Sequence, residues 1–448
     1  LEGCRAMAQG LSSGGSFLEG CRAMARRAQS DGLEQPLLEG EGRLAAGGGP
    51  KREGTPVSAA VNLAATAMGT GVLTLPFAFA RCGPMRCLLL LIFLAATTDV
   101  TLCLMIGAGR RLRLCSLGAI LTRLFGAGGS LAFTVVMGGV VFLALTAMQR
   151  VVLDLLPMFV EELFGLPADS LRPSLVSLVV NVGVFFACMS KSYHSLRFTS
   201  GAALACLLPF VLAIVGRAST ALLETDGEAP ARLVASGASA DGLFVAAPLL
   251  ASSLCCHFSV LDIDAELQPR YRGHMFGVIH VVSLLVLPLT YGLVALAGVA
   301  LFGAGTAENI LTSFHGDAVM QLARGVLSLT NALRMPLIVM PLLSMSLDVL
   351  RSGAGGGKTV ASAMEARSWV SVALLLALSL GTASRMMVLT RVMGLLGGTG
   401  GVLGCFCLPG IMQLCAPASE RTKAKTAAAV GAIFVGALVS TATALTWS

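Results

Sequence analysis

About eleven long apolar stretches follow one another along this chain, and they constrain its fold more than any other feature, because roughly 20 predominantly apolar residues suffice to cross a bilayer as a helix. With 55% apolar residues, 12% charged residues and a mean hydropathy of +0.83, the chain is more apolar than one soluble core can accommodate. The sequence therefore predicts an all-α membrane protein in a lipid bilayer. In chain order the predicted spans are 57–80, 84–107, 130–151, 173–190, 198–216, 242–263, 274–302, 320–350, 368–388, 393–415 and 426–446.

The segment 1–56 differs from the remainder of the chain. It is rich in Gly, Ala, Glu and Arg and has no apolar run, so we expect a disordered cytoplasmic tail before a transmembrane domain at 57–446. With this tail in the cytoplasm, 21 of the 31 Lys and Arg residues fall in the tail and the cytoplasmic loops. The positive-inside rule favours this orientation. Scattered in this way, the basic residues form no patch for a nucleic acid.

The first span contains two glycines and a proline near its centre. Gly69, Thr70 and Gly71 lie at mid-membrane, and Pro76 follows about one turn later. This pattern allows the helix to unwind, so that the second half-helix directs its free N–H groups at an anionic group such as a carboxylate. The alternative is that these small residues allow neighbouring helices to approach closely.

The sixth span contains a second polar centre. Ser252, Cys255, Cys256 and His257 are concentrated there, after Pro248. Two interrupted helices five spans apart are what an inverted five-plus-five repeat would produce. We therefore include these four residues with Gly69, Thr70 and Gly71 as candidate substrate-binding residues.

Three residues are candidates for coupling to an ion. Asp99 lies near the middle of the second span, where a charge is costly and must face the protein interior or titrate. His257 titrates near neutrality when unperturbed. Thr330 offers an oxygen ligand from the eighth span. Each also has a structural alternative: a hydrogen bond between helices for Asp99 and His257, and a bond to its own backbone for Thr330.

Several motifs resemble one family. The first-span GTGVLTLPFAF, the sixth-span CCHFSVLDIDAEL, the stretch ending in GTAENIL and the eighth-span prolines resemble the eukaryotic amino acid/auxin permease family, over nearly all of the chain from residue 57. The resemblance implies a leucine-transporter-type fold with discontinuous first and sixth helices, and secondary transport of amino acids. It also implies that the substrate carboxylate meets the backbone at Thr70 and Gly71, and the amino group meets carbonyls near Cys255 to His257.

The chain departs from that family at two places. Sodium-coupled members have an asparagine four residues before the first glycine of the motif, where this chain has Ala65. An arginine that usually follows the second eighth-span proline is replaced by Leu343, while Arg334 occurs earlier in the same span. The loss of the asparagine favours protons over sodium as the coupling ion.

These observations lead to one expectation with two alternatives. We expect an alternating-access transporter of amino acids, with neutral substrates favoured and H⁺ as the coupling ion, in a vacuolar or lysosomal-type membrane or the plasma membrane. The alternatives are sodium coupling and an amino-acid sensor with little flux. The sequence contains no HExxH, GxSxG or phosphate loop, so we expect no enzyme, no metal and no cofactor.

Overall fold

The computed structural model describes residues 53–114, 116–165, 173–188, 193–224, 241–314, 316–353, 358–385, 388–417 and 421–447. Most of the predicted disordered tail, residues 1–52, lies outside this part. Gly54, at the end of that tail, is held against the chain that follows the sixth span. Its N–H donates to Glu266 O at 3.0 Å, and its carbonyl accepts from Gln268 N at 3.1 Å.

Within the described residues, each predicted apolar stretch is mostly helical, and two of them are broken near the centre. Seven helices in the described part are long and apolar enough to cross a bilayer by themselves, and eight if the bent first pair counts as one span. A count of eleven crossings stays a prediction. The helices are α4 (Pro56–Ala67), α5 (Gly71–Cys82), α6 (Pro84–Leu112), α7 (Leu117–Phe164), α8 (Pro173–Cys188), α9 (Tyr193–Glu224), α11 (Gly242–Ser253), α12 (His257–Glu266), α13 (Met275–Val281), α14 (Leu287–Phe302), α15 (Ala318–Gly353), α16 (Lys358–Arg385), α17 (Leu389–Leu396), α18 (Leu408–Leu414) and α19 (Lys423–Trp447).

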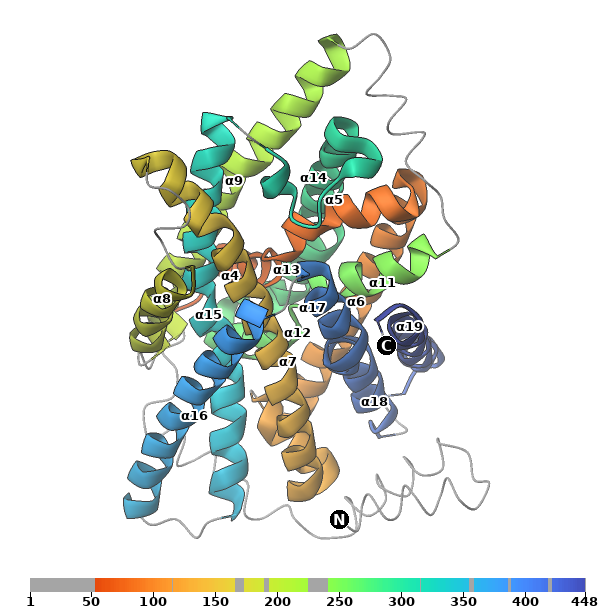
Figure 1. Ribbon diagram of the computed structural model, residues 1–448. Coiled ribbons are helices and arrows are strands. Elements are labelled where there is room, and N and C mark those ends of the chain that lie inside the picture. Colours follow the sequence, from red (N-terminus) through yellow and green to blue (C-terminus); the bar gives the residue numbers. More distant parts are fainter. Residues whose placement is uncertain are drawn as a thin grey trace.

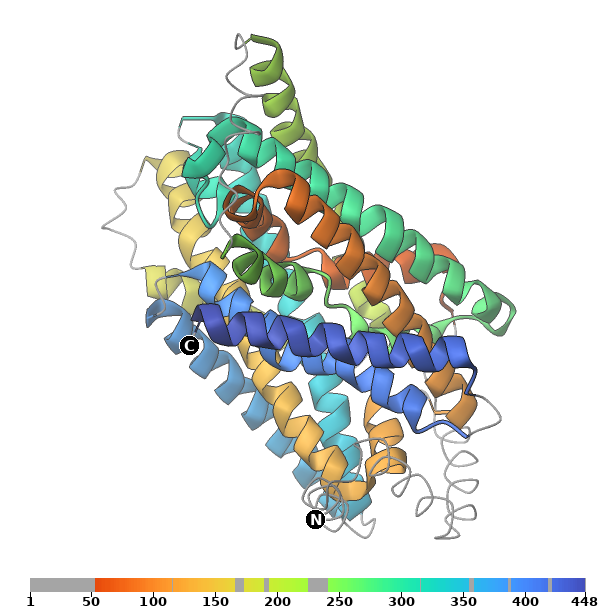
Figure 2. The same ribbon diagram turned by 90° about the vertical axis from the view of Figure 1, so that its right-hand side faces the viewer.

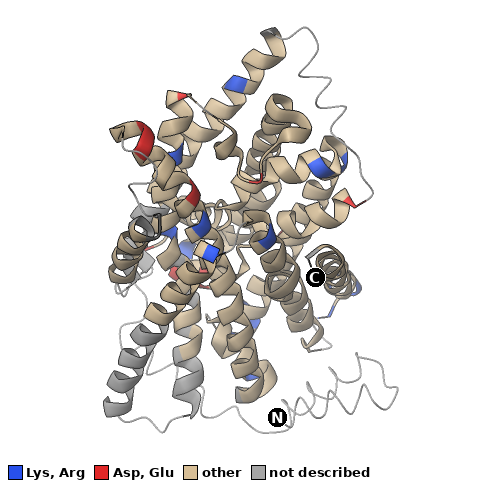
Figure 3. Cartoon of the chain, in the orientation of Figure 1, with Lys and Arg blue, Asp and Glu red and all other residues tan. Residues whose placement is uncertain are grey.

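The helices form one bundle in which segments far apart in sequence pack together (Figure 1). Helix α5 packs on α11 and α14, and α15 packs on α7 and α9. Helix α19 lies along α18 on the outside of the bundle, as the second view shows (Figure 2). Most described positions along the helices are neither Lys, Arg, Asp nor Glu (Figure 3), as expected of helices in a membrane protein.

The first span is broken at its centre. Helix α4 begins with Thr55 as N-cap and Pro56 in its first turn, and it ends at Ala67. After a bend and a turn at residues 68–70 the chain continues as α5, bent by 57° from α4. Helix α5 continues through Pro76 because a proline in a bilayer helix is tolerated where neighbouring helices pack against it.

The sixth span is broken at the equivalent place. Helix α11 ends at Ser253 and α12 begins at His257, with three residues between them. The seventh span is also irregular: a single π-helical turn, Val282–Val286, precedes Pro288. Because proline has no N–H and its ring crowds the carbonyl four residues earlier, this wider turn is a natural accommodation.

Candidate functional site

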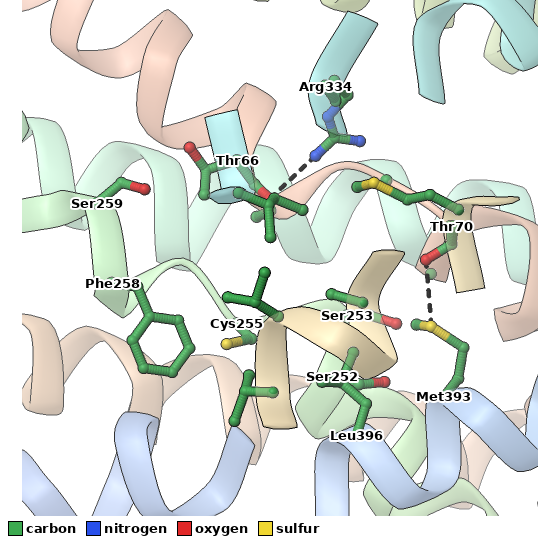
Figure 4. A pocket seen from close by; sticks show the side chains of 18 of the residues that line it. Thr66, Thr70, Ser252, Ser253, Cys255, Phe258, Ser259, Arg334, Met393 and Leu396 are labelled. Atoms are coloured by element: carbon green, nitrogen blue, oxygen red, sulfur yellow. Dashed lines mark hydrogen bonds between the residues drawn. The ribbon is translucent and has the colours of Figure 1, made fainter. Parts of the chain in front are cut away.

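A cavity of about 80 Å³ lies between the two breaks. A single water needs roughly 10–15 Å³ on the same measure, so this space holds several waters or a small ligand. The lining comes from the first, third, sixth, eighth and tenth predicted spans, and ten of its side chains are labelled in Figure 4. The lining residues are Thr66, Ala67, Gly69, Thr70, Gly71, Met137, Val140, Val141, Ala144, Met148, Ser252, Ser253, Cys255, Phe258, Ser259, Arg334, Ile338, Met393 and Leu396.

The beginning of α5 forms one polar edge of the cavity. The N–H groups of Thr70 and Gly71 lie at a helix start, where no preceding turn supplies carbonyl partners. The hydroxyl of Thr70 points away from α5 and donates to Met393 Sδ at 3.1 Å (Figure 4). The positive end of the α5 dipole therefore faces the cavity, which suits an anionic group.

Arg334 of α15 places a positive charge at the same edge. Its side chain is 2% exposed, and its guanidinium donates to Thr66 O at 2.9 Å and to Met68 O. These carbonyls lie at the end of α4, where the helix leaves acceptors without intrahelical donors. Only two of the five guanidinium N–H groups are needed for these bonds. Arg334 thus both stabilises the broken backbone and lines the cavity (Figure 4).

The remaining lining carries no opposing charge. All nineteen lining residues belong to the described part of the chain, and Arg334 is the single Lys, Arg, Asp or Glu among them. In the described residues no carboxylate lies within ion-pair distance of Arg334. A buried cation without a carboxylate partner favours an anionic ligand group, because isolated buried charge is costly.

Tyr291 of α14 connects the two breaks. Its side chain is fully buried, and its hydroxyl lies 2.9 Å from Ala67 O and 2.8 Å from Ser253 O. These carbonyls belong to the ends of α4 and α11. One phenolic proton shared between two helix ends fixes the distance between them.

Replacing Tyr291 with Phe removes that connection. We expect the free energy of unfolding to fall by roughly 1 kcal/mol, because a buried hydrogen bond is lost and the two backbone carbonyls lose their hydroxyl donor. A lower transition temperature in detergent micelles would show this. Tyr271, in the 3-10 turn Pro269–His274, supplies the control: its ring contacts Arg270 and His274, so Tyr271→Phe should leave the transition unchanged. Equal transition temperatures for Tyr291→Phe and the unmodified chain would contradict the role given to Tyr291.

The structure brings most of the candidate substrate-binding residues into one lining. Gly69, Thr70, Gly71, Ser252 and Cys255 all border the cavity. The remaining two candidates, Cys256 and His257, are buried outside the lining.

His257 is fixed by a neighbouring helix. Its Nε2 lies 2.8 Å from Thr101 Oγ1. The Thr101 hydroxyl proton is directed to the carbonyls of Thr97 and Thr98, at 2.9 and 3.0 Å, so His257 Nε2–H is the donor. Nδ1 is then a bare acceptor, and it has no hydrogen-bond partner among the described residues.

The other two coupling candidates lie outside the lining. Thr330 donates to Val326 O at 2.8 Å, a bond within its own helix. Asp99 of α6 contacts His280 and Ser283 of the seventh span. Sequence reasoning missed His280 as a partner of Asp99, although its spacing of three from Ser283 places both on one helix face. It also left Arg334 without a role, although an arginine within an apolar span is itself a functional signal.

Comparisons with known proteins identify the family of the chain. Residues 52–447 match the family described as transmembrane amino acid transporter protein. The amino acid transporter AVT6B of Arabidopsis thaliana is 27% identical over 298 residues, which are 63% of this chain and 64% of that protein. Solute carrier family 38 member 10 of Homo sapiens is 24% identical over 355 residues, 78% of this chain and 32% of that protein. The chain thus spans less than two thirds of the length of these relatives.

A solved structure confirms the predicted fold class. The crystal structure of MhsT in complex with L-phenylalanine superposes with a TM-score of 0.55 at 12% identity, covering 89% of this chain and 99% of that one. At this identity the likeness shows the fold alone. It is the leucine-transporter-type arrangement, with discontinuous helices in the first and sixth spans.

Proposed function

Because the chain belongs to the transmembrane amino acid transporter protein family, we propose that this multi-pass membrane protein carries amino acids by alternating access. The observation that carries the proposal is the cavity between the breaks of α4–α5 and α11–α12. Broken helices present main-chain donors and acceptors at mid-membrane, where a small zwitterion needs both. Rocking of the helices around this fixed site then exposes it to each side in turn.

The polar groups of the cavity match the two ends of an amino acid. The carboxylate binds at the Thr70 and Gly71 N–H groups and the Arg334 guanidinium, where the α5 dipole adds to the positive charge. The amino group binds at the break of the sixth span, beside Ser252 and Cys255. Carbonyls at the end of α11 are the acceptors there.

A neutral side chain fits the rest of the cavity. Methionines, valines and other apolar residues of α7, α15 and α17 line the part away from the breaks, among them Met137, Met148 and Ile338. A cationic side chain would meet Arg334 and no carboxylate in the lining. We therefore propose neutral amino acids as the substrate class.

Protons, rather than sodium, are the proposed coupling ion. Ala65 stands where sodium-coupled members of the family that the sequence resembles have an asparagine, and it is fully buried. The C-terminal end of α4, which is the negative end of its dipole, already contacts a cationic side chain, because Arg334 donates to Thr66 O and Met68 O. A cation at a helix C-terminus is stabilising, so no free metal ion is needed there.

Uptake into proteoliposomes tests the proposal. Labelled neutral, cationic and acidic amino acids are offered under an inward proton gradient, an inward sodium gradient and no gradient. We expect neutral amino acids to accumulate under the proton gradient alone. Accumulation driven by sodium would overturn the coupling ion and keep the class, while saturable binding without flux would identify a sensor.

A further inference from the structure

A histidine and an aspartate face each other within the bundle, away from the cavity. His280 Nδ1 of α13 lies 2.8 and 3.0 Å from the two carboxylate oxygens of Asp99 on α6. Ser283, in the π-helical turn of the same span, donates to Asp99 Oδ1 at 2.7 Å. The Asp99 side chain is 11% exposed, whereas the His280 side chain is 52% exposed. One partner is therefore buried and the other is accessible.

This pair differs from four other carboxylate pairs in the described part of the chain. Asp264, Asp154, Glu162 and Asp317 each pair with an arginine: Arg110, Arg150, Arg324 and Arg217, respectively. Arginine stays protonated in proteins, so these four carboxylates keep a permanent counter-charge. The partner of Asp99 is instead a histidine, which is charged only when it is protonated.

The surroundings add one further titratable group. Cys103 Sγ of α6 lies within 4.8 Å of a carboxylate oxygen of Asp99 and of a ring nitrogen of His280. The elements packed against α6 and α13 are α4, α5, α7, α11, α12, α14, α18, α19, the 3-10 turn Pro269–His274 and the π-helical turns Val282–Val286 and Leu403–Cys407. No described Lys or Arg on any of them reaches ion-pair distance of Asp99. The charge of the site is thus set by the two residues themselves.

We propose that Asp99 and His280 bind the coupled proton, an assignment that rests on the proposed function. The Nδ1–H group donates to Asp99, and Nε2 gains or loses the proton. With the proton bound, the pair is an aspartate beside an imidazolium, with no net charge. Without it, the pair carries one negative charge, which a position at mid-membrane disfavours. The occupied and empty sites therefore prefer different surroundings, as a coupled transporter requires.

The fold connects this pair to the cavity. His280, Ser283 and Tyr291 belong to one span, and Tyr291 holds the ends of α4 and α11. Helix α13 and the π-helical turn both pack on α4, whose last residues Thr66 and Ala67 line the cavity. A π-helical turn within an α-helix is frequently found at a functional site. Displacement of His280 would thus reach both breaks through α4 and Tyr291.

Two transport modes separate this role from a structural one. Proton-driven accumulation needs proton flux, whereas exchange of internal for external substrate does not. For Asp99→Asn and His280→Gln we expect accumulation under a proton gradient to fall at least tenfold, while exchange stays within about twofold of the unmodified chain. Substrate-induced alkalinisation outside the vesicles, followed with a pH dye, should disappear in both variants.

Each other outcome overturns the assignment. Unchanged proton-driven accumulation in either variant would exclude the pair as the proton site, and loss of exchange in both would indicate a structural pair. Cys103→Ser is the matched control and should behave as the unmodified chain. If proton-driven accumulation falls equally in Cys103→Ser and after metal chelation, the site binds a metal ion and not the coupled proton. Absence of all flux in the unmodified chain would refute the proposed function instead.

Discussion

Replacing Arg334 with Gln is expected to weaken binding of the substrate about 10- to 150-fold. The guanidinium lines the cavity, and hydrogen bonds to charged groups contribute roughly 1.5–3 kcal/mol, which corresponds to this change in Kd. Glutamine keeps a donor but loses the charge and the forked geometry of arginine. Binding is measured by displacement of a labelled amino acid from the purified protein.

The substrate carboxylate itself provides the decisive comparison. The unmodified chain should bind an amino acid more tightly than the corresponding amino acid amide, and Arg334→Gln should remove most of that preference. If Arg334 only holds Thr66 O and Met68 O in place, Arg334→Gln should weaken the binding of the amino acid and of its amide equally. An undiminished preference for the carboxylate in Arg334→Gln would therefore refute the anchor role.

Helix α15 offers a matched control for this experiment. Arg324 is also buried, at 1% exposure, but it pairs with Glu162 and donates to Leu311 O, outside the cavity lining. Arg324→Gln should lower the free energy of unfolding, because it leaves the carboxylate without its counter-charge. It should leave the preference for carboxylate over amide unchanged.

The fold was predictable from the sequence because the bilayer limits the choices. Apolar runs of sufficient length must be helical, since no water satisfies the backbone there. The two breaks were predictable from local residues: Gly69 and Gly71 lower the cost of unwinding, and polar residues from Ser252 to His257 mark the second break. The five cavity-lining residues named from the sequence all lie in or beside these breaks.

Contacts between distant segments were not predictable in this way. Arg334 meets Thr66 O, which is 268 positions away in the chain, and His280 meets Asp99, which is 181 positions away. Periodicity indicates which face of a helix is polar but not which helix lies opposite. His257 illustrates the same point, because its position at the break suggested the cavity, yet its side chain turns to Thr101 of α6.

Gly71→Ala is expected to reduce transport roughly tenfold or more. An added Cβ would lie 2.6 Å from Ser253 Cβ and 3.0 Å from Ser253 Cα, and it would also overlap Ser253 Oγ. Overpacking of this kind costs about 1–3 kcal/mol, and here it separates α5 from α11 where both breaks meet. Initial uptake rates in proteoliposomes, corrected for the amount of inserted protein, measure the effect.

A compensating change shows whether the contact itself is responsible. Ser253→Gly removes the atoms that the new methyl group overlaps, so Gly71→Ala combined with Ser253→Gly should recover part of the lost rate. The remaining 3.0 Å approach to Ser253 Cα limits the recovery. Gly138→Ala is the control, since an added Cβ there meets no atom within 4 Å. Equal rates for Gly71→Ala and Gly138→Ala would mean that α5 and α11 tolerate separation, and that their close approach does not shape the binding site.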